Sequence, residues 1–103
     1  MTTKVKSVYE DLKYANADEM LIKAKLVTEI ADQLKRRHVT QIEASELLGF
    51  SQPKLSNLLR GQFRGVSEKK LMEFLTKLGR DIEIVVRPAP RSRREGKISV
   101  AVT

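Results

Sequence analysis

The sequence contains no cysteine, no tryptophan, one histidine and three prolines among its 103 residues. Without cysteine the chain can form neither disulfides nor thiolate metal sites, which fits the reducing cytoplasm, the location that we expect. It has no run of about 18 apolar residues, so we expect no membrane-spanning helix and no membrane partner. The N-terminal stretch MTTKVKSVYEDLKYA lacks the apolar core of a secretory signal.

Residue patterns typical of catalytic and cofactor sites are also missing. His38 stands between Arg37 and Val39 at the predicted end of a helix, where an imidazole is ordinarily solvated. The sequence has no nucleophile elbow, phosphate-binding loop, dinucleotide fingerprint or metal-ligand spacing. It therefore predicts no catalytic residue, no metal and no cofactor, and a protein that is not an enzyme.

What the chain has in excess is positive charge. Its net charge is +7. The length of the chain and its 41% apolar and 32% charged residues are typical of one globular domain. The excess is largest in residues 66–103, which carry nine basic and five acidic residues. A small basic domain often binds a polyanion, although such a charge also serves solubility.

The first two-fifths of the chain predict a lead-in followed by a long helix. We assign residues 1–17 to the lead-in, because NADE reads as a capping box in which Asn16 is the N-cap and Glu19 reaches back. The helix is then expected from Glu19 to about Arg37. Its apolar residues recur at helical spacing, with Ile30 flanking a stripe made of Met20, Ala24, Val27, Ala31 and Leu34.

Two short helices should follow, joined by a tight turn. TQIE is a second capping box, with Thr40 as N-cap of a helix that runs to Leu48 and stops at Gly49. Ser51 should cap the next helix, which runs to Arg60. Because Gln52 precedes a proline and is biased away from helix, Gln52 is the alternative cap.

A fourth helix is predicted from Glu68 to Leu78, capped by Ser67 and ended by Gly79. The apolar period then changes from helical to alternating in DIEIVVR and KISVAV, which predicts two strands. We expect residues 80–103 to form a β-hairpin that serves as a dimerisation element, and residues 18–79 to form the DNA-binding domain discussed next.

The pair of short helices has the spacing of a DNA-binding helix-turn-helix, whose second helix enters the major groove. The alternative is an ordinary corner of two helices that serves only the core. The second helix favours the DNA-binding interpretation, because its outward face has hydrogen-bonding groups and no acid. The residues of that face are Gln52, Lys54, Ser56, Asn57 and Arg60.

The stretch TQIEASELLGFSQPKLSNLLRG resembles the Xre/Cro-repressor type of helix-turn-helix. The layout from VYEDL and NADEM to LGRDIEIVVRP, over roughly residues 8–103, is also similar to HigA-type antitoxins of bacterial toxin–antitoxin operons. Ser45 departs from the alanine usual in the first motif helix, but serine is still small. The resemblance implies a mainly α, lambda-repressor-like domain of four to five helices, here followed by the two-stranded hairpin.

The resemblance also implies a function and partners. We expect a sequence-specific repressor that binds a double-stranded DNA operator as a homodimer, and as an antitoxin it would also bind a RelE/ParE-like toxin. Two alternatives stay open, namely a free-standing or phage-type regulator without a toxin, and a protein-interaction module.

Individual roles follow by position in the motif. Gln41 looks like the family glutamine that binds a phosphate and braces the recognition helix. Gln52 matches the principal base-reading position, and its amide can bind adenine N6 and N7. Lys54 can reach a guanine or a phosphate, and Arg60, near the helix end, is assigned to phosphate. The full predicted DNA-binding set is Gln41, Ser51, Gln52, Lys54, Ser56, Asn57 and Arg60.

The stretch between the two predicted strands is basic and has two interpretations. It is either a solvated tip or a source of further phosphate or minor-groove contacts. Its basic residues are Arg87, Arg91, Arg93, Arg94 and Lys97.

Overall fold

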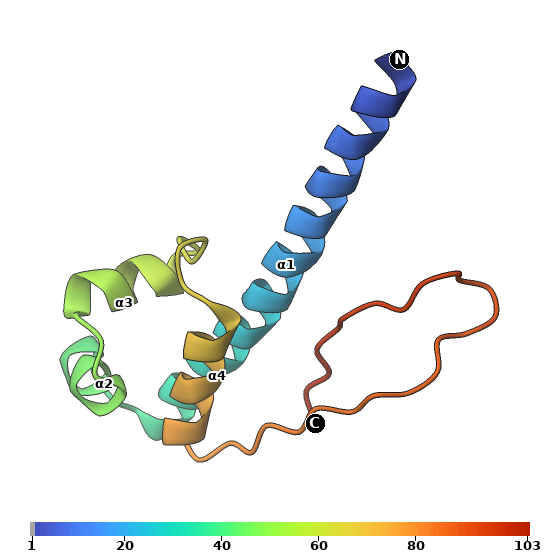
Figure 1. Ribbon diagram of the computed structural model, residues 1–103. Helices are drawn as coiled ribbons and strands as arrows, with labels where there is room; N and C mark the ends of the chain where they lie inside the picture. Colours follow the sequence, from blue (N-terminus) through green and yellow to red (C-terminus); the bar gives the residue numbers. More distant parts are fainter. Residues whose placement is uncertain (1) are drawn as a thin grey trace.

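The computed structural model describes the backbone of residues 2–103 and the side chains of residues 18–103. It consists of four helices, followed by an extended C-terminal segment (Figure 1). The helices are α1 (Thr2–Arg37), α2 (Gln41–Leu48), α3 (Gln52–Leu59) and α4 (Glu68–Lys77). The ends of α2, α3 and α4 agree with the sequence prediction to within a residue.

The start of α1 differs from the prediction. The helix begins at Thr2, so the NADE capping box does not start it, and the backbone of Asn16 is helical. The stretch before Asn16 contains neither proline nor glycine, so nothing in it stops a helix from continuing towards the N-terminus. The side chain of Asn16 lies outside the described side chains. The division into residues 1–17, 18–79 and 80–103 remains a prediction.

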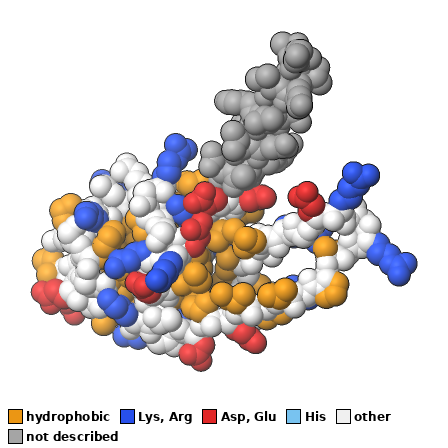
Figure 2. Space-filling model, in the orientation of Figure 1, with side chains coloured by type: hydrophobic (Ala, Val, Ile, Leu, Met, Phe, Trp, Pro, Cys, Tyr) orange, Lys and Arg blue, Asp and Glu red, His pale blue; other side chains and the backbone are white. Residues whose placement is uncertain are grey.

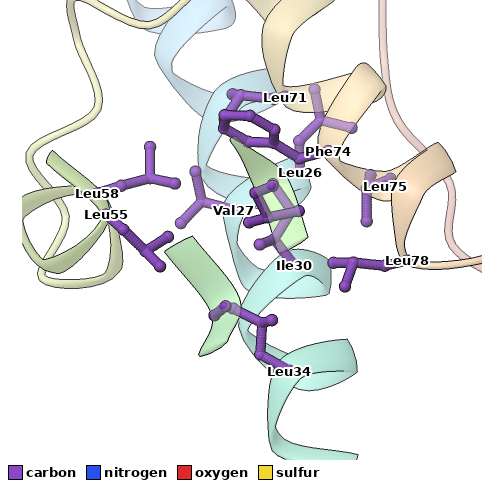
Figure 3. Packing of buried hydrophobic residues seen from close by; sticks show 12 residues of the cluster. Leu26, Val27, Ile30, Leu34, Leu55, Leu58, Leu71, Phe74, Leu75 and Leu78 are labelled. Atoms are coloured by element: carbon purple, nitrogen blue, oxygen red, sulfur yellow. The ribbon is translucent and has the colours of Figure 1, made fainter. Parts of the chain in front are cut away.

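The core lies where α4 packs along the C-terminal half of α1, with α2 and α3 closing the other side (Figures 1 and 3). On α4 the sequence predicts one apolar stripe at helical spacing. The stripe is confirmed, because its members are at most 2% exposed: Leu71, Phe74, Leu75 and Leu78. The buried apolar residues are Leu26, Val27, Ile30, Leu34, Ala44, Leu48, Leu55, Leu58, Leu71, Phe74, Leu75 and Leu78.

Two details of the predicted interior are wrong. On α1 the stripe is rotated, because Ile30 is fully buried while Ala31 is exposed. On α2, the sequence also predicts Leu47 and Ile42 in the interior between the two short helices, but they are 39% and 57% exposed. A helix of two turns has only one narrow face against the core, and Ala44 and Leu48 occupy it.

The predicted C-terminal β-hairpin is not present, because residues 80–103 contain no strand. This segment, called the C-terminal arm below, leaves α4 at Gly79 and makes a wide loop back to the helices (Figure 1). Its two sides are called the first leg (residues 81–87) and the second leg (residues 97–103). An isolated two-stranded hairpin is marginally stable in water, and alternating apolar residues alone do not supply a surface for it to cover.

The arm is tied to the helices at both ends. At its start, Arg80 Nε lies 3.6 Å from the Glu29 carboxylate, and the Arg80 guanidinium donates to the Thr103 carbonyl at 2.8 Å. At its end, Lys25 Nζ donates to the carbonyl of Val100 at 3.3 Å, and the Val100 side chain packs against the core. The fold is therefore a helical body from which a closed loop projects.

Candidate nucleic-acid interface

The turn between α2 and α3 is defined by local hydrogen bonds that the sequence predicts. Thr40 and Glu43 form the capping box: the Glu43 amide donates to Thr40 Oγ1 at 3.1 Å, and the Thr40 amide donates to Glu43 Oε1 at 3.3 Å. Gly49 ends α2 with φ +65°, in the left-handed region. The Phe50 amide then donates to the Ser45 carbonyl at 3.0 Å and closes the turn.

Helix α4 holds the same turn from outside the motif. Lys77 Nζ donates to the Leu48 carbonyl at 3.1 Å, which satisfies an end group of α2. The ring centroids of Phe50 and Phe74 lie 5.0 Å apart with the ring planes tilted by 57°, within the range of distances at which aromatic pairs attract. The angle between α2 and α3 is therefore fixed by packing as well as by the turn.

Helix α3 begins at the predicted serine cap. Ser51 Oγ accepts from the Lys54 amide at 3.4 Å, so Ser51 rather than Gln52 is the N-cap. Pro53 lies in the first turn, where its missing N–H costs little. Leu55 and Leu58 are fully buried and press α3 onto the core, which leaves the opposite face to solvent.

The predicted site residues lie on α2 and on or beside α3. Gln41 is exposed at the first position of α2, and Ser51, Gln52, Lys54 and Arg60 are exposed on or beside α3. Ser56 and Asn57 are half-buried on the same helix. The α3 members are exposed or half-buried, on the parts of the helix that Leu55 and Leu58 do not press onto the core. Gln41 lies apart from them, on the neighbouring helix.

Two of these side chains are bonded to each other. Arg60 Nη2 donates to Asn57 Oδ1 at 2.7 Å, so the guanidinium is held against the last turn of α3. The amide oxygen of Asn57 is used in this bond, which leaves its NH₂ group to face a ligand as a donor. The sequence predicts both residues as members of the site, but nothing in it indicates that they pair.

Lysines from two helices adjoin this face. Lys54 Nζ lies 5.9 Å from the centre of the Phe50 ring, and Lys70 Nζ lies 5.6 Å from the centre of the Phe74 ring. Such cation–π contacts attract an ammonium group to the ring face. Lys70 Nζ also lies 3.9 Å from the Glu73 carboxylate. A hollow of about 470 Å³ lies among Phe50, Lys54, Asn57, Gln62, Ser67 and Lys70.

Lys70 and Gln62 were not predicted as members of the site. Both follow α3 in the sequence. The Gln62 amide donates to the Asn57 carbonyl at 2.9 Å, which holds Gln62 beside Asn57, whereas the packing of α4 against the turn brings Lys70 beside Lys54. The basic residues of the arm are not placed in this hollow. The arrangement offers amide and cationic groups on one surface, suited to phosphates and to base edges in a DNA groove.

Other kinds of site were also considered. His38 is exposed and ends α1 with φ +55°, as expected for a solvated histidine after a helix. Among residues 18–103, no three His, Asp or Glu side chains gather as metal ligands would. Within the described part of the chain, no helix is long and apolar enough to cross a membrane.

Comparison with known proteins shows the family of the chain. Residues 8–87 match the family described as "Helix-turn-helix domain". The solved structure of a "Putative XRE Family Transcriptional Regulator" is similar, with 37% sequence identity and a TM-score of 0.78. The match covers 84% of this chain and 98% of that one. No curated protein matches the chain significantly.

Proposed function

Because this chain belongs to the helix-turn-helix domain family, we propose that it is a sequence-specific DNA-binding repressor whose α3 reads a double-stranded operator. The family match and the similarity to the XRE-family regulator support a DNA-binding transcription regulator. The observation that carries the proposal is the outward face of α3, from Ser51 to Arg60, which has amide, hydroxyl and cationic groups and no acid.

The roles of the individual residues are divided by position. Gln52, exposed in the first turn of α3, is the proposed base reader, since its amide can bind both N6 and N7 of adenine. Arg60, held by Asn57 at the far end, is the proposed phosphate anchor. Gln41, at the N-terminus of α2, is the second proposed anchor, because helix N-termini favour anions.

The remaining site residues have supporting roles in this proposal. Lys54, beside the Phe50 ring, can reach a guanine or a phosphate. Ser51 offers its hydroxyl at the start of α3, and Ser56 and Asn57 lie further along, within reach of the groove.

The test of DNA binding is its dependence on salt. Neutralised phosphates release counterions, so with about four to six phosphate contacts per dimer the log–log slope of affinity against salt should be about −4 to −5. Fluorescence anisotropy with random duplex DNA measures this slope without knowledge of the operator. A flat dependence, or no binding at low salt, would contradict the proposal and favour a protein-interaction module.

We further propose that the protein binds its operator as a homodimer. One recognition helix reads only a few base pairs, whereas two helices about 34 Å apart read a palindrome that spans one turn of DNA. Selection of bound sequences from a random pool should therefore recover paired half-sites. Recovery of single, unpaired half-sites would refute the dimer but leave DNA binding intact.

The antitoxin role rests on the resemblance to HigA-type proteins alone. In that role the protein would also bind a RelE/ParE-like toxin, and release from DNA would come through this partner or through degradation. A gene for a small basic RelE- or ParE-like protein beside this one, and a stable complex of the two on co-expression, would support it. Without such a neighbour the alternative, a free-standing or phage-type regulator, is favoured.

A further inference from the structure

The first leg of the C-terminal arm is apolar and uncovered. Six of the nine large hydrophobic side chains exposed in the described part of the chain lie in the arm. Four of the six belong to the first leg, where Ile84 is 79% and Val86 is 93% exposed. Figure 2 shows the arm standing away from the body, with an opening between its two legs and basic side chains at its tip. A folded chain rarely leaves such a segment without a partner.

The backbone of the first leg is uncovered as well. Within the described residues, the only main-chain hydrogen bond made by residues 81–103 among themselves is from the Arg93 amide to the Pro90 carbonyl. The first leg therefore presents a row of N–H and C=O groups flanked by β-branched side chains, which is the surface that pairs with another extended chain. The second leg differs, because Val100 already packs on the helical core.

The charges of the first leg identify what it would pair with. The segment DIEIVVR starts with acidic residues and ends with a basic one. An antiparallel copy centred on Ile84 brings Asp81 opposite the partner's Arg87 and Ile82 opposite the partner's Val86. Opposite charges and β-branched pairs directly across from each other stabilise such a pairing, and a parallel copy would instead align like charges.

We propose that the first leg pairs, antiparallel and centred on Ile84, with the first leg of a second copy of this chain. This inference gives the proposed homodimer its surface and rests on that proposal. The pairing is between chains and does not involve the second leg. Shifting the pairing by two residues, so that it is centred on Val85, would set Ile82 opposite the partner's Pro88, which lacks an N–H and a branched side chain, so the register centred on Ile84 is preferred.

The test is a charge exchange in the full-length protein, read out by sedimentation equilibrium without DNA. The wild type should be a dimer at about micromolar concentration. Asp81→Arg or Arg87→Asp alone should weaken dimerisation about tenfold or more, which corresponds to about 1.4 kcal/mol, because like charges then face each other. The double variant should restore the dimer. A monomeric wild type, or a double variant as weak as the singles, overturns the inference.

Two further variants fix the location and the register. Ile84→Glu places two glutamates together at the two-fold axis and should give a monomer, while its helix content and thermal unfolding stay unchanged because the Ile84 side chain is exposed. Glu95→Arg, at the tip of the arm, is the matched control and should remain dimeric. If the double variant of Glu83→Arg and Arg87→Asp restores the dimer, and the double variant of Asp81→Arg and Arg87→Asp does not, the register is wrong.

Failure of this inference is distinguishable from failure of the proposed function. If the double variant dimerises but does not bind DNA at low salt, the pairing is supported and the proposed DNA-binding function is refuted. A protein that binds DNA with the expected salt slope while Ile84→Glu remains dimeric refutes the pairing and leaves the regulator intact.

Discussion

Replacing Lys23 with methionine should destabilise the fold, although the change removes a charge from the interior. Lys23 is only 4% exposed, in the middle of α1. Its Nζ donates to the Arg64 carbonyl at 2.9 Å and lies 3.3 Å from the Glu19 carboxylate. Arg64 belongs to the loop that follows α3, so this lysine joins the longest helix to the segment that leaves the recognition helix.

The magnitude follows from these two contacts. A hydrogen bond that involves a charged group is worth about 1.5–3 kcal/mol. The ion pair adds little, about 0–1 kcal/mol, because the Glu19 side chain is 47% exposed. Methionine avoids the cost of burying an ammonium and fills part of the same space, which offsets some of the loss. We expect Lys23→Met to lower the free energy of unfolding by about 1–2 kcal/mol, the range typical of a damaging single substitution.

Urea unfolding followed by circular dichroism measures this loss, and the slope with denaturant should not change. Lys25→Met is the matched control, because Lys25 is exposed and its Nζ bond to the Val100 carbonyl is long, at 3.3 Å. The control should change stability by less than about 0.5 kcal/mol. If Lys23→Met unfolds at the wild-type midpoint, or if Lys25→Met loses as much, Lys23 does not stabilise the loop as described.

Two further predictions concern α3 and the turn before it. Gln52→Ala should cost about 1–3 kcal/mol on the operator and relax specificity at one base pair per half-site, whereas Arg60→Ala should weaken specific and random DNA alike. Anisotropy titrations on both DNAs decide this, and equal losses on all sequences for both variants would contradict the division into reader and anchor. Gly49→Ala should destabilise by about 1 kcal/mol in thermal unfolding, because φ is +65° while a Cβ would meet only Lys77 Nζ at 3.6 Å. Gly65→Ala, with open space around its Cβ, is the control and should be neutral, and an equal effect of both changes would refute the role of the left-handed turn.

The sequence predicts well those elements whose ends are set locally. Thr40, Ser51 and Ser67 all cap helices as expected, because a cap depends on residues within one turn. The start of α1 was missed, because NADE has the letters of a capping box but the chain before it can also be helical. The hairpin was missed, because alternation of apolar residues does not say which surface the segment will cover.

The candidate site divides in the same way. The polar face of α3 could be predicted from helical spacing and from the absence of acids in it. The bond between Arg60 and Asn57 could not, because it depends on the rotamers of two side chains with several partners within reach. The position of Lys70 beside Lys54 depends on how α4 crosses the turn, which is a property of tertiary packing.

The basic tip of the arm limits how many copies of the chain can associate through their arms. A segment of β-branched residues with an open backbone is a hazard for aggregation, and flanking charges are the usual protection against it. Here Arg91, Arg93 and Arg94 lie between the two legs, and basic side chains stand at the tip of the arm (Figure 2). Stacking of many arms in register would crowd these arginines into a column of like charge, whereas one antiparallel pair keeps the two tips apart. We therefore expect association to stop at two copies, and the colloidal stability of the protein to fall if these arginines are neutralised.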